Sequence, residues 1–295
     1  MNPDYSVSAI ITTYNRKESV IRALRSVIKQ TRQPDEIILV DDGSSDGTEH
    51  VILDAFPQIK YIKQENRGIS SARNTGIIHS TSQWLAFLDS DDEWLVKKLE
   101  KQLDALTLYP SYRICHSDEL WIRKGHRVNP KKKHQKYGGD IFIKCLPLCV
   151  ISPSAVIIHR ELFKKYGLFD TALPACEDYD MWLRLCAYIP VLFIEEPLII
   201  KYGGHPDQLS AKYWGLDRFR IYALEKIISE MNLDPAKKKA AVEMLIHKID
   251  VYIKGAMKRG KLEEVSEYLE KRKKYHSKNH PLIFRGSRYS NTSNR

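Results

Sequence analysis

Apolar residues in the first hundred positions alternate between short continuous runs and longer stretches of mixed polarity. Residues 7–11 and 36–40 form runs whose length is typical of strands buried on both faces. Between these runs, apolar residues of segment 17–30 recur at helical spacing. The alternation continues and predicts a βαβαβαβ series. Its other predicted strands are 59–62 and 84–88, and its other helices begin near Gly47, at Ser70 and around Trp94.

Such a series folds into an α/β domain, with a mostly parallel, Rossmann-like sheet and helices on both faces. Ligands of these sheets bind outside the carboxyl ends of the strands. Polar clusters follow three of the predicted strands, at residues 12–14, 41–42 and 89–91. We therefore expect a ligand site at this edge of the sheet.

The rest of the chain divides into two parts. Residues 111–153 are less regular and predict a variable excursion beside the site, followed by strands at 154–159, 191–194 and 198–200 and helices at 160–166 and 178–187. From about Lys212, apolar residues at helical spacing predict three basic helices. We expect one domain over residues 1–210 and a basic helical appendage over 211–295.

The charge and hydropathy of the chain limit its possible binding partners and its expected location in the cell. The net charge is +10, and lysine-rich runs lie at 131–133, 237–239 and 271–274. These runs suit an anionic membrane surface, a phosphorylated substrate or a solvated face, and nucleic acid ranks last because no nucleic-acid-binding module is present. No apolar run reaches the roughly 20 residues of a membrane span. We expect a cytoplasmic protein, with peripheral contact to the inner face of the membrane as one hypothesis.

The five cysteines match no zinc or disulfide framework. An odd number without paired spacing favours reduced thiols, most of them buried. The CxxxC pair of Cys145 and Cys149 lacks a second pair to complete a metal site, so core filling is the preferred interpretation.

Asp89 and Asp91 lie two positions apart on a predicted turn. Two such carboxylates can hold one hard cation, Mn²⁺ or Mg²⁺, and leave positions open for phosphate oxygens. That cation would neutralise a diphosphate leaving group. The alternative is structural, because Asp91 or Asp92 could cap the helix predicted around Trp94.

Two further clusters could contact a nucleotide. Asp42 follows the second strand, where its carboxylate could accept hydrogen bonds from a base or a ribose, although turn chemistry explains the same residues. Arg73 lies in the first turns of a predicted helix, where it could pair with a diphosphate. The alternative for Arg73 is an ordinary surface position.

A third acidic cluster, Glu177-Asp178-Tyr179-Asp180, precedes an amphipathic helix. Its carboxylates could simply complement the helix dipole. They could also supply a general base, which takes the proton of an acceptor hydroxyl on the face opposite the leaving group.

The combination of motifs resembles the family-two glycosyltransferases. The matching segments are residues 7–16 (VSAIITTYNR), 34–44 (PDEIILVDDGS), 66–68 (NRG) with 71–74 (SARN), 87–94 (FLDSDDEW), and Glu177-Asp178 before 182–184 (WLR). They occur in the family's order and cover roughly residues 5–210. The resemblance implies a GT-A fold and an inverting sugar transfer, with a UDP-sugar as the favoured donor.

The same resemblance implies roles for individual residues. The nucleotide contacts would be Thr12, Tyr14, Asp42, Arg73 and Asp89, and the metal ligands would be Asp89, Asp91 and His205. Asp178 would be the catalytic base, with Asp180 left open as an alternative. The acceptor would be a saccharide or a lipid-linked sugar in cell-surface polysaccharide or lipopolysaccharide synthesis.

Two other functions compete with this one. A sugar-nucleotide pyrophosphorylase would need a glycine-rich basic loop after the first strand, and residues 12–16 contain no glycine. A non-catalytic nucleotide-binding module could share the fold, although the presence of both Asp91 and Asp178 favours an enzyme.

Overall fold

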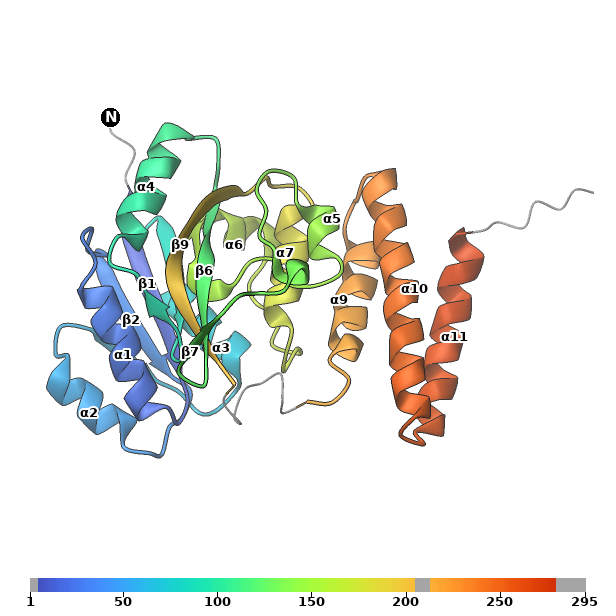
Figure 1. Cartoon of the computed structure of the whole chain (residues 1–295), viewed down its shortest axis with the longest axis horizontal. Helices are drawn as coiled ribbons and strands as arrows, with labels where there is room; N and C mark the ends of the chain where they lie inside the picture. Colours follow the sequence, from blue (N-terminus) through green and yellow to red (C-terminus); the bar gives the residue numbers. More distant parts are fainter. Residues whose placement is uncertain (1–4, 205–212, 280–295) are drawn as a thin grey trace, which may run out of the picture.

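The computed structural model describes residues 5–204 and 213–279. Its strands lie in one curved sheet with helices on both faces, and three C-terminal helices stand beside this layer (Figure 1). The strand order is β3-β2-β1-β4-β8-β6-β9-β5, and β7 pairs with β6. The strands are β1 (Val7–Thr13), β2 (Glu36–Asp41), β3 (Lys60–Lys63), β4 (Trp84–Asp89), β5 (Glu93–Trp94), β6 (Ile114–Arg123), β7 (His126–Val128), β8 (Val156–His159) and β9 (Leu192–Gly203).

The first half of the chain folds as the apolar pattern predicts. Strands β1 to β4 pair in parallel, and their register places Thr12 beside Asp89 and Thr13 beside Asp41. The carboxyl ends of three strands therefore meet at one edge. The helices of this half are α1 (Lys17–Ile28), α2 (Thr48–Ala55), α3 (Ile69–His79) and α4 (Lys98–Leu108).

The second half contains more regular structure than predicted. The segment expected to be irregular contains the ten-residue strand β6, which is antiparallel to β8 and parallel to β9. The two short strands predicted at 191–194 and 198–200 are one strand, β9, because a register shift opposite Ser117 and Asp118 absorbs the polar interruption at Glu195 and Glu196. The sheet is thus parallel at one side and mixed at the other.

The helix predicted around Trp94 begins later. Trp94 lies in β5, where its indole N–H donates to the carbonyl of Ser154 at 2.9 Å, and α4 starts at Lys98. The residue before α4 is Lys97, which makes no side-chain cap. The alternative that Asp91 or Asp92 caps this helix is therefore wrong.

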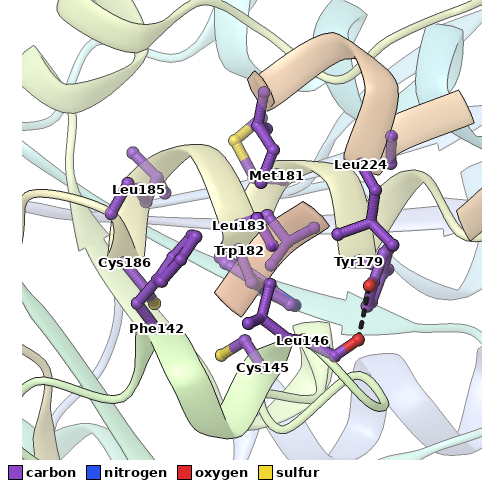
Figure 2. Packing of buried hydrophobic residues seen from close by; sticks show 14 of the residues in the cluster. Phe142, Cys145, Leu146, Tyr179, Met181, Trp182, Leu183, Leu185, Cys186 and Leu224 are labelled. Carbon is purple, nitrogen blue, oxygen red and sulfur yellow. Dashed lines mark hydrogen bonds between the residues drawn. The ribbon is translucent and has the colours of Figure 1, made fainter. Parts of the chain in front are cut away.

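Two large buried apolar clusters cover the two faces of the sheet, and a third, small one joins β2 to α3. Residues of α1, α2 and α4 pack on one face, and residues of α3, α5 (Phe142–Cys145), α6 (Glu161–Tyr166) and α7 (Glu177–Cys186) pack on the other. Figure 2 shows the centre of the second cluster, where Trp182 and Tyr179 of α7 lie among Phe142 and Leu224. Trp182 is fully buried, and the Tyr179 hydroxyl donates to the carbonyl of Leu146 at 2.6 Å. This packing fixes the helix whose first turn carries Asp178.

Residues 213–279 contain three helices, as predicted: α9 (Asp217–Glu230), α10 (Pro235–Met257) and α11 (Leu262–Asn279). They form the orange-to-red bundle in Figure 1. Their apolar residues belong to the same buried cluster as those of α7, from Ile221 to Tyr275. A domain boundary near residue 210 stays a prediction. Within the described residues, every helix is too short or too polar to cross a bilayer.

The start of α10 offers a test of this bundle. Asp234 accepts the N–H of Lys237 at 2.8 Å, and Pro235 occupies the first helical turn. We expect Asp234→Ala to lower the free energy of unfolding by about 1 kcal/mol, because one helix N–H loses its partner. Urea denaturation measures the change, and Asp234→Asn, which can still cap, is the control. Equal destabilisation by both variants would contradict the capping role.

Candidate active site

The predicted residues of the first strand lie at the carboxyl edge of the sheet. Thr12 is buried between β2 and β4, whereas Tyr14 is 48% exposed just beyond the strand end. Asn15 adopts a left-handed conformation at φ 49°, and its side-chain oxygen accepts the N–H of Ser45 at 2.8 Å. The turn after β1 is thereby tied to the turn after β2, with Tyr14 facing solvent.

Asp42 is committed to loop structure. Its carboxylate accepts the backbone N–H groups of Arg67 at 3.0 Å and Gly68 at 2.8 Å, and the amide of Gln64 at 2.6 Å. Gly68 has φ 87°, a conformation in which glycine is favoured, and it is followed directly by α3. Asp42 thus holds the entry to α3, and its predicted contact with a nucleotide stays a prediction.

Arg73 of α3 occupies the centre of the site. It is 3% exposed, so the surface alternative is wrong. One guanidinium nitrogen lies 2.7 Å from Asp89 Oδ1, and another lies 2.6 Å from Glu177 Oε1. The bridge brings the end of β4 and the start of α7 together, although 88 residues separate Asp89 from Glu177 in sequence (177 − 89).

The two carboxylates beside Arg73 differ in their protonation. Burial raises the pKa of Glu177 to about 7, and the charge of Arg73 opposes that rise only in part. Burial also acts to raise the pKa of Asp89, but the Arg73 guanidinium outweighs it and holds this pKa below its ordinary value. Asp89 therefore stays ionised near the strand end, while Glu177 titrates close to neutral pH.

The aspartates at the end of β4 and in the turn after it have different partners. Asp91 forms an ion pair with Arg16 at 2.6 Å and keeps an exposed face. Asp92 is buried, and it accepts the hydroxyl of Ser154 at 2.6 Å and the N–H of Tyr202 at 3.2 Å. Burial raises the pKa of Asp92 well above its ordinary range. Asp92 is therefore a structural group, whereas contact of Asp89 and Asp91 with a nucleotide or metal stays a prediction.

These two carboxylates fit a hard cation. Mg²⁺ is commonly held by one or two carboxylates and completed by substrate phosphates and water, which Asp89 and Asp91 on one turn can provide. No cluster of three or more His, Cys, Asp or Glu side chains able to hold a metal occurs among residues 5–204 and 213–279. His205, the third predicted ligand, lies outside the described residues. The metal assignment stays a prediction.

The start of α7 distinguishes the two candidate bases. Asp180 is fully buried, 2.8 Å from Arg184 and 3.4 Å from Lys226, so it is held in an ion-pair network. Asp178 forms no ion pair within 4 Å among the residues that the structure describes. Its Oδ2 accepts the thiol of Cys149 at 3.1 Å, and its Oδ1 accepts the N–H of Tyr179 at 2.7 Å. Of the two carboxylates, Asp178 is therefore the less constrained, and its role as the base stays a prediction.

Several residues next to the site were not predicted from the sequence. Lys201 near the end of β9 is directed inward, and its ammonium donates to the hydroxyl of Ser152 at 3.1 Å. Burial alone would lower the pKa of Lys201, but Glu119 and Asp92 raise it above its ordinary value. The one available signal was a lysine at the end of an apolar strand, because buried lysines are rare. Cys149 gave no such signal, since only the fold brings it to Asp178.

Comparison with known proteins identifies the family to which the chain is related. The model for glycosyl transferase family 2 matches residues 8–167, which is more than half of the chain. An uncharacterised glycosyltransferase of Rickettsia typhi is 35% identical over 199 residues, covering 65% of this chain and 62% of the relative. The match to one of Rickettsia felis covers only 35% of that relative. The chain thus spans less than two thirds of both Rickettsia proteins.

A named relative and a solved structure agree with this family. The Escherichia coli protein WfgD, UDP-Glc:alpha-D-GlcNAc-diphosphoundecaprenol beta-1,3-glucosyltransferase, is 32% identical over 190 residues, covering 62% of this chain and 70% of WfgD. The structure of Staphylococcus aureus TarS 1-349 in complex with UDP-GlcNAc aligns with a TM-score of 0.66 at 18% identity, covering 95% of this chain and 93% of TarS 1-349. That likeness confirms the expected GT-A fold. The chain belongs to glycosyl transferase family 2.

Proposed function

We propose that the protein is an inverting glycosyltransferase that moves a sugar from a nucleoside-diphosphate donor, preferably a UDP-sugar, to a hydroxyl of an acceptor. The observation that carries this proposal is the Arg73 bridge, which holds the donor-side Asp89 and the base-side Glu177 on either side of one guanidinium. Asp178 directly follows Glu177. Because Arg73 contacts both carboxylates, the residues proposed to face the leaving group and the residue proposed as the base belong to one site.

The chemistry assigned to each side is as follows. Asp178 accepts the proton of the acceptor hydroxyl as that oxygen attacks the anomeric carbon, and the bond to the diphosphate breaks on the opposite face. The sugar configuration inverts because the attack occurs once and from one side. A divalent cation held by Asp89 and Asp91 would neutralise the diphosphate that leaves. Thr12, Tyr14 and Asp42 would contact the nucleotide.

The donor and acceptor classes follow from the relatives. TarS has been solved with UDP-GlcNAc, and WfgD is named for a UDP-glucose donor, a diphosphoundecaprenol-linked acceptor and a β linkage. We propose a UDP-sugar donor and a saccharide or lipid-linked acceptor, with a role in cell-surface polysaccharide synthesis. Inversion at an α-linked donor sugar yields a β linkage, in keeping with the product named for WfgD.

The alternative of a non-catalytic nucleotide-binding module makes a different use of the same site. It would retain Asp91 and the donor pocket but would not need a carboxylate at position 178. Asp178 accepts a hydrogen bond from the thiol of Cys149 and lacks an ion-pair partner among the described residues. A carboxylate with so few partners favours the enzyme. A pyrophosphorylase remains disfavoured by residues 12–16, which contain no glycine.

The base assignment predicts a clear contrast between two neighbouring carboxylates. Asp178→Asn should lower the rate of transfer at least a hundredfold, since general-base catalysis contributes about 10²–10⁴, and should leave UDP binding and the melting temperature nearly unchanged. Asp180→Asn should instead lower the melting temperature, because it leaves the buried Arg184 without its carboxylate partner.

Transfer assays with a UDP-sugar and thermal melts on both variants measure this contrast. Near-normal transfer by Asp178→Asn would exclude it as the base. An unchanged melting temperature of Asp180→Asn would contradict its structural role.

The metal assignment predicts coupled binding of nucleotide and cation. UDP with Mn²⁺, at about 100 times its dissociation constant, should stabilise the fold by roughly 2.7 kcal/mol. We expect Asp91→Asn to lose the Mn²⁺-dependent part of this stabilisation. Glu93→Gln is the matched control, since Glu93 lies in the same segment but accepts the hydroxyl of Tyr202 at 2.8 Å.

The shift in melting temperature is measured with UDP, GDP, dTDP and CMP, each with and without Mn²⁺. The nucleotide that gives the largest shift identifies the nucleobase of the donor. Equal Mn²⁺-dependent shifts for Asp91→Asn and the unmodified protein would move the metal elsewhere.

Peripheral membrane contact through the lysine-rich runs makes a separate prediction. Arg272 of α11 is paired with Asp250, and Lys237 of α10 is paired with Asp140, which reduces the charge available to lipid. If the remaining cations bind anionic lipid at the cytoplasmic face, binding to phosphatidylserine vesicles should fall steeply between low and high salt. Co-sedimentation tests this, and salt-independent binding or none would return these runs to a solvated face.

A further inference from the structure

A pocket of about 340 Å³ lies where the segment before α9 meets the start of α9 and the end of α10. We call it the bundle pocket, and the residues that matter for its chemistry are Trp214, Asp217, Arg220, Tyr252 and Arg259. It is formed by the helical part of the chain, beyond the residues that match the family. The donor-side residues Asp89 and Asp91 do not line it.

One wall of the bundle pocket is aromatic. Trp214 stacks on Tyr252 with ring centroids 5.3 Å apart and planes inclined by 27°. Gly215 has φ 62°, and a Cβ at this position would lie 2.8 Å from the Tyr252 ring. The chain can therefore bend tightly around Tyr252 only with glycine at 215. Tyr268 packs on Tyr252 with ring centroids 4.3 Å apart, and the ammonium of Lys261 lies 4.4 Å from the Trp214 ring centroid, so this wall is a rigid aromatic stack already in contact with a cation.

The other wall has an excess of positive charge. Arg220 of the lining and Lys248, which lies outside the lining, approach the same carboxylate, Asp217, at 2.8 and 3.1 Å, so two cations share one anion. Arg259 donates to the carbonyl of Gly255 at 2.9 Å and lies 5.5 Å above the Trp214 ring, without a carboxylate within 4 Å among the described residues. The buried Nε of Arg220 also lacks a hydrogen-bond partner there. Such a wall attracts an anion.

The bundle pocket lies next to the start of the base-carrying helix. The thiol of Cys176 is 3.9 Å from the carbonyl of Leu216, a residue of the pocket lining. Cys176 immediately precedes Glu177 and Asp178 and has a left-handed backbone at φ 63°. In Figure 1, the starts of α9 and α11 and the end of α10 lie at the lower edge of the molecule, toward which β1 also runs. The pocket is therefore on the base side of the site.

We propose that the bundle pocket binds the phosphate-bearing part of a phosphorylated saccharide acceptor, with the phosphate at Arg220 and Arg259. This inference rests on the proposed transferase function. Inverting transfer requires the acceptor on the side of Asp178, and the donor diphosphate belongs at the opposite side with Asp89 and Asp91. A planar guanidinium matches phosphate geometry, and the pocket volume is within the range of small-ligand sites.

Binding of three probes tests the proposal in buffer with EDTA, which prevents metal-mediated binding at the donor turn. The probes are N-acetylglucosamine 1-phosphate, N-acetylglucosamine linked to a short prenyl diphosphate, and unphosphorylated N-acetylglucosamine. Isothermal titration should detect the phosphorylated probes and not the plain sugar. Binding of the prenyl probe alone would identify a lipid-linked source of the phosphate, and equal binding of both phosphorylated probes would identify the sugar phosphate itself.

Substitutions locate the binding. Arg259→Gln should weaken binding of the phosphorylated probe about tenfold, the effect expected for one charge-assisted hydrogen bond. Lys258→Gln removes the same charge one residue away, outside the pocket lining, and should change nothing. Arg220→Gln should act like Arg259→Gln, and its melting temperature checks for a loss of folding. Arg259→Gln decides the question if Arg220→Gln does not fold.

UDP binding with Mn²⁺ on the same samples separates the two proposals. Unchanged probe binding by Arg259→Gln, or no binding of either phosphorylated probe to a protein that does bind UDP, would overturn the bundle pocket alone. Failure to bind UDP would instead count against the transferase function on which the pocket depends.

Discussion

The buried guanidinium of Arg73 is the interaction on which the site depends. A charge so deeply buried is tolerated only when it is paired and hydrogen-bonded, and Arg73 meets this condition with Asp89 and Glu177. If either carboxylate moved away, one buried N–H group of the guanidinium would lose its hydrogen-bond partner. The ends of β4 and α7 are therefore held at one fixed separation by α3. In an inverting transfer, that separation sets the distance between the leaving group and the base.

The acidic residues at this edge divide into two groups by their surroundings. Asp42, Asp92 and Asp180 are buried, and backbone N–H groups, hydroxyls or cations occupy their oxygens. Asp91, which pairs with Arg16, and Asp178 are only partly buried. The structural carboxylates hold the turns rigid, so that the accessible ones are preorganised before substrate binds. Preorganised charge of this kind is the largest contribution in many enzymes.

The sequence predicted the parallel half of the fold well because local apolar periodicity and short connections determine it. It failed for β6 and β9, since their pairing joins segments about 80 residues apart and includes a register shift that no local pattern announces. For the site, strand ends predicted the positions of Asp42, Asp89 and Asp91. Which carboxylate is structural could not be predicted, because Asp178 and Asp180 differ only in partners such as Arg184, Lys226 and Cys149 that folding brings to them.

The C-terminal helices bear on the chemistry through the core they share with α7. Trp182 and Met181 of α7 pack in the same buried cluster as Leu224 of α9 and Leu245 of α10. The family match ends at residue 167, ten residues before the helix that carries the proposed base (177 − 167). The proposed acceptor side of the site is thus held by the part of the chain outside that match. A different helical bundle on the same sheet would present Asp178 to a different acceptor while leaving the donor side unchanged.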